Sequence, residues 1–305
     1  MGDIDLGKVV VAGGSGLVGR RLVATLARKG VRITILSRAP QAIEPPPGVE
    51  ARGWDDLPRT LEGVDAVVNL CGEGIADARW TEARQRRVLD SRVGPTERLV
   101  QAMAAAAPRP RALVNASAVG YYGARDERPV DEDADPGRGF LSRVCVDWEA
   151  AAQAAADHGV RVAVLRLGVV LARDGGALPK MARAMRWCLG AKLGGGRQGL
   201  SWIHVDDLVR LVLEVAGNPA YRGPVNATAP ALVSNEAFTR TLCRRLHRLM
   251  LPAPGWATGA AVKMLLGQMG REMLLEGAYV LPGKAEELGF TFRFPKLEDA
   301  LKDLL

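Results

Sequence analysis

Three glycines near the N-terminus have the spacing that a phosphate-binding turn requires. Gly13, Gly16 and Gly19 follow an apolar run at residues 8–12 and precede a helical pattern at residues 17–30. Glycine lets the chain turn tightly and lets a phosphate approach the backbone, while the start of a helix offers free N–H groups and partial positive charge. The pattern therefore predicts a dinucleotide site. We expect the contacts to come from Gly13, Gly16, Leu17 and Val18.

The end of the next apolar run, residues 31–36, indicates which dinucleotide is bound. A site that prefers NAD places an acidic residue there, where it bonds the ribose hydroxyls. This sequence has Ser37 and Arg38 instead. The Arg38 guanidinium can pair with a 2′-phosphate and the Ser37 hydroxyl can donate to it, whereas an acid would repel that group. We therefore expect NADP(H) as the cofactor.

An alternation of short and long patterned segments predicts the scaffold that holds this turn. Over the first two thirds of the chain, short apolar runs rich in β-branched residues alternate with longer amphipathic stretches. Such an alternation is typical of a parallel sheet with helices on both faces. The expected fold class is α/β, a Rossmann-type doubly wound parallel sheet. The expected strands are residues 8–12, 31–36, 66–70, 112–115 and 160–167, and the expected helices are residues 17–30, 81–107 and 141–157.

The pattern changes after about residue 171, where helical segments dominate between glycines and prolines. We expect residues 1–171 to form the NADP-binding Rossmann domain, which a strand at residues 221–229 rejoins. Residues 172–305 are expected to form a smaller, mostly helical portion. Because open α/β sheets bind ligands at the carboxyl ends of their strands, this portion is expected to complete the substrate cleft.

Composition and charge narrow the classes of function. Hydrophobic residues make up 48% and charged residues 25% of the 305 residues, and no apolar run approaches the roughly eighteen residues of a membrane span. The net charge is +7, but basic residues alternate with acids along helical stretches, so we do not expect nucleic acid as a partner. Because no spanning run is present, we do not expect a membrane partner either. Four scattered cysteines argue against disulfides and a metal site and favour the cytoplasm. They are Cys71, Cys145, Cys188 and Cys243.

Several further segments carry a family resemblance. Together with the glycine turn, they resemble the extended short-chain dehydrogenase/reductases, the NAD(P)-dependent epimerase/dehydratase family. More narrowly, they resemble a subgroup of sugar-nucleotide-epimerase-like proteins with a short C-terminal domain of unknown function, and the resemblance covers essentially the whole chain. It implies cofactor contacts from Leu70, Cys71 and Gly72, and a homodimer is an option that it leaves open. The segments are residues 69–72, 74–81, 117–123, 201–208, 223–230, 275–277 and 281–283.

The chain departs from that family at the two residues that do its acid–base chemistry. Members of the family have a Tyr-x-x-x-Lys pair, in which the tyrosine acts as the acid or base while the lysine lowers its pKa and holds the nicotinamide ribose. When Glu149 is aligned with the acid that often follows the lysine, Leu141 takes the place of the tyrosine and Cys145 that of the lysine. Leucine has no proton to give, and a thiol carries no fixed positive charge.

Other side chains are candidates for the missing catalytic chemistry. Ser117 matches the hydroxyl residue that orients the substrate in the family. Tyr121 and Tyr122 follow it on the loop at the strand's carboxyl end, where one of them could face the nicotinamide. Packing or a bond to the backbone is the alternative for each tyrosine. For Arg166, a position near the nicotinamide and a salt bridge at the strand end both remain open.

Three more residues are candidates for contact with the substrate. Glu73 follows the cofactor-side Gly72 and could face the cleft, or it is a solvated loop acid. Trp202 could stack on a substrate, with helix packing as the alternative. For His204, a place in the site and a packing role are both open.

Two functions follow from these residues. The first is an NADP(H)-dependent oxidoreductase or isomerase of epimerase/dehydratase type, with an atypical acid/base in place of Tyr-x-x-x-Lys. Its small-molecule substrate would be nucleotide-linked, phosphorylated or lipophilic. The second is a non-catalytic NADP(H)-binding protein, a redox sensor or a scaffold.

Overall fold

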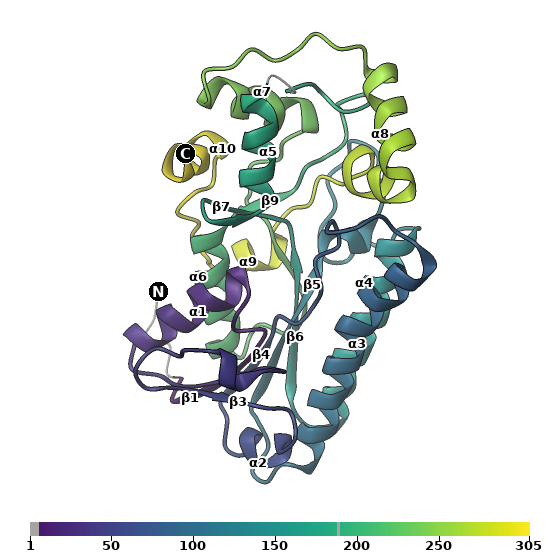
Figure 1. Cartoon of the computed structure of the whole chain (residues 1–305). Helices are drawn as coiled ribbons and strands as arrows, with labels where there is room; N and C mark the ends of the chain where they lie inside the picture. The colour runs from purple at the N-terminus through teal and green to yellow at the C-terminus, as the bar shows by residue number, and fades with distance from the viewer. Residues whose placement is uncertain (1–5, 188–189) are drawn as a thin grey trace.

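The centre of the molecule is a parallel sheet of seven strands, in the order β10-β6-β5-β4-β1-β2-β3. The computed structural model describes residues 6–187 and 190–305. All the strand pairs of this sheet are parallel, so the expected Rossmann-type α/β fold is confirmed (Figure 1). The strands are β1 (Lys8–Ala12), β2 (Arg32–Leu36), β3 (Val49–Arg52), β4 (Ala66–Asn69), β5 (Ala112–Ala118), β6 (Arg161–Leu167) and β10 (Gly223–Ala227).

Helices cover both faces of the sheet because successive strand residues point to opposite sides. In β1, Val9 and Val11 pack into one core and Val10 and Ala12 into another. Figure 1 shows α1 and α6 beside one face and α3 and α4 beside the other. The helices over the first core are α1 (Leu17–Arg28) and α6 (Val205–Gly217); those over the second are α2 (Leu57–Leu61), α3 (Glu82–Ala105) and α4 (Phe140–Gln153), with the short helix η3 (Ala154–His158).

A second, small sheet was not expected from the sequence. Its order is β8-β7-β9, with β7 parallel to β9 and antiparallel to β8. These strands have two to four residues each, which is too short for a period-two pattern to stand out. The edge strand β3 was also missed, because only Val49 of its four residues is buried. The small strands are β7 (Val169–Ala172), β8 (Gly175–Gly176) and β9 (Trp202–His204).

The remaining helices gather at the carboxyl end of the large sheet, at the top of Figure 1. A core that contains Trp202, Phe238 and Leu301 joins α5, α7 and α10 there. The helices of this end are α5 (Ala177–Arg186), α7 (Asn235–Arg245), α8 (Gly255–Gly270), the π-helical turn η4 (Arg271–Leu275) and α10 (Leu297–Leu304), while α9 (Gly283–Glu287) lies against β10. The 3-10 turns η1 (Pro40–Ala42) and η2 (Val119–Tyr122) follow β2 and β5.

The structure bears on three expectations about composition. Cys71, Cys145 and Cys243 are free thiols, and Cys188 lies outside the described residues. Within residues 6–187 and 190–305, no cluster of three metal-ligating side chains occurs. In the same part of the chain, no helix combines the length and the apolar character needed to cross a bilayer.

Candidate functional site

The glycine turn after β1 has the geometry of a phosphate cradle. Gly13 has a φ of +81°, and a Cβ on it would lie 2.8 Å from the Leu70 carbonyl oxygen. A Cβ on Gly19 would overlap the Gly13 carbonyl oxygen, so any other residue there would push α1 off the turn. Helix α1 begins at Leu17 without a side-chain cap and without an acid in its first turn. Its first N–H groups are thus available to an anion, and the turn fits a pyrophosphate.

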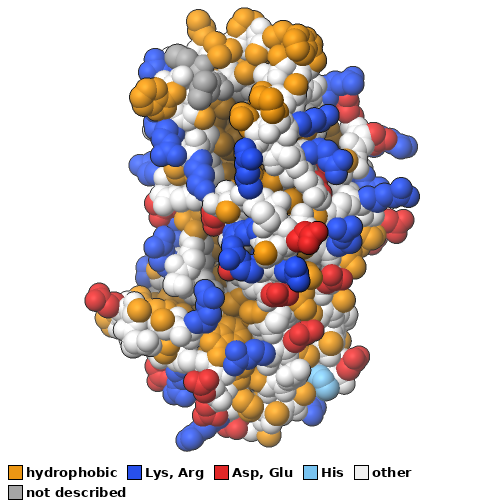
Figure 2. Space-filling model, turned by 45° about the vertical axis from the view of Figure 1, so that its right-hand side comes forward, with side chains coloured by type: hydrophobic (Ala, Val, Ile, Leu, Met, Phe, Trp, Pro, Cys, Tyr) orange, Lys and Arg blue, Asp and Glu red, His pale blue; other side chains and the backbone are white. Residues whose placement is uncertain are grey.

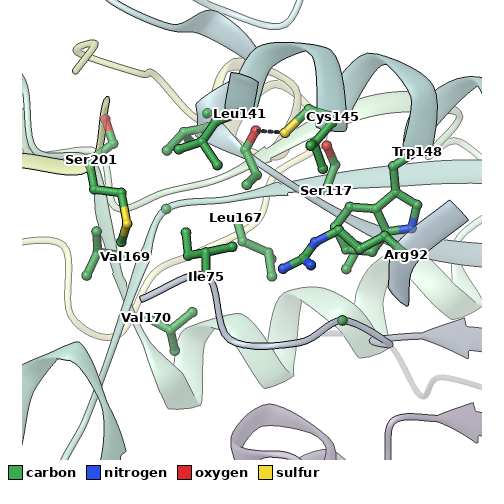
Figure 3. Close-up of a pocket in the computed structure, with 18 of the residues that line it drawn as sticks. Ile75, Arg92, Ser117, Leu141, Cys145, Trp148, Leu167, Val169, Val170 and Ser201 are labelled. Atoms are coloured by element: carbon green, nitrogen blue, oxygen red, sulfur yellow. Dashed lines mark hydrogen bonds between the residues drawn. The ribbon is translucent and has the colours of Figure 1, made fainter. Parts of the chain in front are cut away.

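A cavity of about 530 Å³ opens where β1, β4, β5 and β6 end (Figure 3). The glycine turn forms one wall, the first turns of α4 form another, and the segment after α8 closes a third side. This is the position at which open α/β sheets bind ligands. The residues expected at the turn and after β4 all line it: Gly13, Gly16, Leu17, Val18, Leu70, Cys71 and Gly72.

Ser37 and Arg38 follow β2 and lie beside this cavity rather than in its wall. The Ser37 hydroxyl accepts a hydrogen bond from the backbone N–H of Ala39 at 3.1 Å. Burial raises the pKa of the Cys71 thiol to about 11, and the charge of nearby Arg38 opposes part of that rise. Arg38 forms no ion pair with the described residues. Its guanidinium is therefore free to meet an anion next to the Cys71 end of the cavity.

Helix α4 brings the two atypical residues into the cavity wall. Leu141 and Cys145 both line the cavity, one helical turn apart. The Cys145 thiol donates to the Ala118 carbonyl oxygen at 3.6 Å. Burial is the main reason why its pKa is raised to about 11, so the thiol is neutral near pH 7. Neither side chain can replace the acid or the cation of the family's Tyr-x-x-x-Lys pair.

Ser117 is held in the cavity wall by a buried carboxylate. Its hydroxyl donates to Glu149 Oε1 at 2.6 Å. Arg166 donates to both oxygens of Glu149, at 3.0 and 2.9 Å, and the two side chains are only 4% and 14% exposed. Arg166 therefore forms a salt bridge at the end of its strand. Because the Ser117 proton is donated to Glu149, the Ser117 oxygen can still accept a hydrogen bond from a hydroxyl group in the cavity.

Tyr121 and Tyr122 pack around Arg166 and do not line the cavity. Tyr122 is fully buried; its hydroxyl donates to Asn226 Oδ1 at 2.7 Å and accepts from Arg166 at 2.9 Å. Burial raises its pKa to about 12. The Tyr121 ring centre lies 3.5 Å from the Arg166 guanidinium carbon. The geometry thus favours the packing alternative for both tyrosines, because η2 turns their rings toward the Arg166 ion pair.

The three substrate-side candidates also lie outside the cavity wall. Trp202 is 1% exposed and belongs to the core of the C-terminal end. His204 is equally buried: its Nδ1 accepts from the Asp206 N–H at 3.1 Å and so caps α6. The Glu73 carboxylate pairs with Arg84. Each side chain is thus committed to a structural partner, and we propose none of them as a direct contact to a ligand.

Arg92 lines the cavity from α3, a position that was not predicted from the sequence. Its Nη1 donates to the Val88 carbonyl oxygen at 2.8 Å and its Nη2 to the Glu73 carbonyl oxygen at 2.9 Å. The guanidinium lies 5.3 Å from the Trp148 ring centre and extends toward Leu167 (Figure 3). Burial lowers the pKa of the Arg92 guanidinium below its usual value, and an arginine side chain keeps its charge near pH 7.

A signal for Arg92 was present in the sequence. It lies four residues after Val88 and four before Thr96, and both of those residues are fully buried. An arginine on the buried stripe of an amphipathic helix needs a reason to be there. The reason is that the Arg92 side chain lines the cavity.

Glu272, in the turn that follows α8, was also missed. Its two carboxylate oxygens accept from the backbone N–H groups of Phe140 and Leu141 at 3.1 and 3.0 Å, and its side chain is 4% exposed. The acid therefore caps the positive end of α4 while it lines the cavity. No local pattern could reveal this contact, because 131 residues separate Glu272 from Leu141.

Comparison with known families agrees with this geometry. The model of the NAD dependent epimerase/dehydratase family matches residues 9–226. The chain belongs to this family. A second model, the domain of unknown function DUF1731, matches residues 257–304. The resemblance stated from the sequence motifs is thus confirmed, including the C-terminal domain.

Members of the epimerase/dehydratase family resemble this chain along its whole length. An epimerase family protein of Mycobacterium bovis is 42% identical over 294 residues, or 96% of each chain. The Arabidopsis thaliana protein described as a chloroplastic homolog of epimerase family protein SDR39U1 is 38% identical and covers 97% of this chain and 86% of its own.

Solved structures place the fold in the same family. The crystal structure of human epimerase family protein SDR39U1 with NADPH is 36% identical, with a TM-score of 0.87 over 97% of this chain and 98% of that one. UDP-N-acetylglucosamine 4-epimerase from Bacillus cereus is 17% identical, with a TM-score of 0.73 over 98% and 95% of the two chains. At that identity the likeness shows a shared fold and nothing more.

Proposed function

We propose that this protein binds NADP(H) and uses it to transfer a hydride to or from a small substrate with an apolar body. The observation that carries the proposal is the phosphate cradle at Gly13–Gly19 opening into one continuous cavity with Ser117 and Arg92. The solved human relative contains NADPH, which supports the same cofactor here. When bound, the cofactor would supply a hydride at its nicotinamide ring.

The residues that would hold the cofactor form two groups, one at its adenosine and pyrophosphate end and one at its nicotinamide end. The N–H groups at the start of α1 would bind the pyrophosphate, and Arg38 would meet the 2′-phosphate, where an acid would select NAD. On the other side of the pyrophosphate, Arg92 would hold the nicotinamide half with a fixed positive charge. The cation that the family carries on the helix of Leu141 and Cys145 would thus come from α3 in this chain.

The wall around the reacting end favours an apolar substrate over a bare sugar. Side chains without hydrogen-bonding groups form most of it, whereas a sugar presents hydroxyls that each need a partner. Ser117 is the side chain that we propose to orient the hydroxyl form of the substrate, by accepting its hydrogen bond while Glu149 accepts the Ser117 proton at 2.6 Å. When a carbonyl is reduced, water in the cavity would supply the proton that accompanies the hydride. The apolar lining residues here are Ile75, Leu141, Leu167, Val169, Val170, Leu200 and Met273.

Two measurements test the cofactor and the reaction. Isothermal titration should give tighter binding of NADPH than of NADH, and Arg38→Ala should remove that preference. Loss of NADPH absorbance should then appear with some members of a panel of quinones, ketones and sugar nucleotides, with the apolar carbonyl compounds turned over fastest. Equal affinity for both cofactors would overturn the NADP(H) assignment. Turnover of sugar nucleotides alone would overturn the assignment of the substrate.

A second candidate function is a non-catalytic NADP(H)-binding sensor or scaffold. Leu141 and the neutral Cys145 thiol favour it, since they abolish the acid–base pair but leave the binding site intact. In that case NADPH would raise the melting temperature strongly, no compound of the panel would be turned over, and Ser117→Ala would change nothing. Under the enzymatic proposal, Ser117→Ala keeps NADPH binding and lowers turnover.

A further inference from the structure

The exposed large hydrophobic side chains of this protein are concentrated at one end. Of the seven such side chains among the described residues, six lie directly after α5, on α8 or on the segment between α7 and α8. We call these six the apolar tip. Figure 2 shows hydrophobic side chains clustered at the upper end of the molecule. The six are Trp187 (76% exposed), Leu249 (89%), Leu251 (41%), Trp256 (80%), Met264 (79%) and Leu265 (55%).

The segments that carry the apolar tip are packed into one body. The Leu251 N–H donates to the Gly190 carbonyl oxygen at 2.7 Å, which joins the segment after α7 to the segment after α5. The Gly194 N–H donates to the Thr258 hydroxyl at 3.1 Å, which joins that loop to α8. The tip residues therefore share one end of the fold (Figure 1).

The segments that carry the apolar tip are basic. Residues 177–200 and 235–270 contain ten lysines and arginines and one acid, a net charge of +9, whereas the chain as a whole has +7. Several of these cations are exposed and form no ion pair with described residues, and two of them, Arg186 and Arg248, directly precede Trp187 and Leu249. The exposed cations without an ion-pair partner are Arg183, Arg186, Arg244, Arg248 and Lys263.

Helix α8 is apolar around most of its circumference, yet it buries little. Its sixteen residues include a single charged one, Lys263, and only Gly259, Met269 and Gly270 are buried. A soluble surface helix normally pairs an apolar face toward the core with a polar face toward water. Here apolar side chains such as Met264 and Leu265 point outward. Helix α8 therefore has the composition of a helix that contacts the protein core on one side and another apolar surface on the other.

We propose that the apolar tip docks this protein onto the surface of a membrane that contains anionic phospholipids. Tryptophan side chains are favoured at the interface between headgroups and acyl chains, and nearby arginines attract anionic lipid. With sixteen residues, α8 is shorter than the roughly twenty that a spanning helix needs, so the contact is peripheral. This revises the expectation of no membrane partner, which rested on the absence of a spanning segment.

Charge and apolar character together favour an anionic membrane over a second copy of the chain or a nucleic acid. A second copy of the chain docked tip to tip would bring the exposed, unpaired arginines and lysine of the two tips together, and these like charges repel. Nucleic acid would satisfy the arginines but would leave Leu249 and Met264 in water, since neither offers a ring for base stacking. In an anionic membrane the apolar side chains would contact the acyl chains and the basic side chains would contact the headgroups.

Vesicle binding tests the proposal on the full chain. We would measure flotation with vesicles of phosphatidylcholine alone and of phosphatidylcholine mixed with phosphatidylglycerol. The expected result is binding to the anionic vesicles that weakens as salt is added. Arg186→Gln/Arg248→Gln should lower the affinity by roughly tenfold to thirtyfold, and Trp187→Ser/Leu249→Ser/Trp256→Ser by about a hundredfold or more. Arg32→Gln/Arg59→Gln is the matched control, because both arginines are exposed and lie away from the tip segments.

A second readout does not depend on the variants. Trp187 and Trp256 are the most exposed tryptophans, and Trp148 and Trp202 are buried. Brominated phospholipids should therefore quench the fluorescence of the wild type and quench Trp187→Ser/Trp256→Ser much less. Circular dichroism and NADPH binding report whether each variant is folded.

Three results would overturn the proposal. One is no flotation with anionic vesicles at low salt. Another is an equal loss of binding in the control and in the tip variants, which would mean that overall charge binds the lipid. The third is a dimer in sedimentation velocity that the tip variants convert to a monomer while vesicle binding is absent, which would make a second copy the occupant.

Discussion

Replacing Arg92 with methionine should weaken the binding of NADPH and leave the binding of adenosine 2′,5′-bisphosphate unchanged. The second ligand carries the 2′-phosphate but lacks the nicotinamide half of the cofactor. Methionine is nearly as long as arginine and keeps an apolar contact with Trp148, so the substitution mainly removes the charge. The two ligands together separate the proposed role of Arg92 from a general disturbance of the site.

The size of the effect follows from the surroundings of Arg92. The guanidinium lines the cavity, and two of its hydrogen bonds go to backbone oxygens, of Val88 and Glu73. A hydrogen bond from a charged donor contributes about 1.5–3 kcal/mol. Loss of one such bond to the cofactor should raise the Kd of NADPH by about ten- to a hundredfold. Because α3 also loses the two backbone contacts, some loss of stability is expected in addition.

Fluorescence titration of NADPH and calorimetry with adenosine 2′,5′-bisphosphate are the assays. Arg38→Ala is the matched comparison and should weaken both ligands. Adding Cys145→Lys to Arg92→Met places the cation on α4, where the family carries it, and should recover part of the NADPH affinity. The reasoning fails if Arg92→Met leaves the NADPH affinity unchanged, or if it weakens both ligands equally while the variant stays folded.

Three further predictions concern groups whose surroundings are well defined. Burial lowers the pKa of His204 below the usual 6.5, so the unfolded chain takes up the proton at a higher pH than the folded protein and stability falls as pH drops below about 6.5. Urea unfolding should show this loss of stability. The variant His204→Asn, whose side chain can still cap α6, should show a smaller loss. Cys71, with a pKa of about 11, should react slowly with N-ethylmaleimide near pH 7, faster as pH rises toward that pKa, and more slowly with NADPH present, as peptide mass spectrometry would show. Asp207 is 1% exposed and accepts the backbone N–H groups of residues 293 and 294 at 2.8 Å, so Asp207→Ala should lower the free energy of unfolding by about 3–5 kcal/mol; an unchanged urea midpoint would contradict it.

The sequence was most informative where chemistry and local structure coincide. At Gly13–Gly19 the spacing of one residue type specifies the turn, the strand before it and the helix after it, and the structure has all three. The long apolar runs of β1, β4 and β6 were visible for the same reason, since each is buried on both faces of the sheet. Edge strand β3 and the two-residue β8 lack that double burial and gave no signal.

The catalytic end was harder to predict, because residue type does not fix where a side chain points. Tyr121 and Tyr122 follow Ser117 closely, but η2 turns them toward Arg166 and leaves Ser117 in the wall. Trp202 and His204 have the chemistry of site residues, yet β9 buries both. Arg92 could have been found from its place on the buried stripe of α3. Glu272 could not, because its partners are distant in sequence.

The contact between Glu272 and the start of α4 also sets an order for the maturation of the chain on the ribosome. Leu141 is synthesised 131 residues before the carboxylate that accepts its N–H, a delay of roughly 10 s at ordinary elongation rates. Throughout that interval the nascent chain has an uncapped α4. A chain that stops between β10 and Glu272 would carry the glycine turn and all seven strands of the large sheet but an unfinished cavity. A segment made late in synthesis thus completes a pocket whose first wall was made early, and products truncated before Glu272 should be recognised by chaperones and proteases even though their Rossmann strands are present.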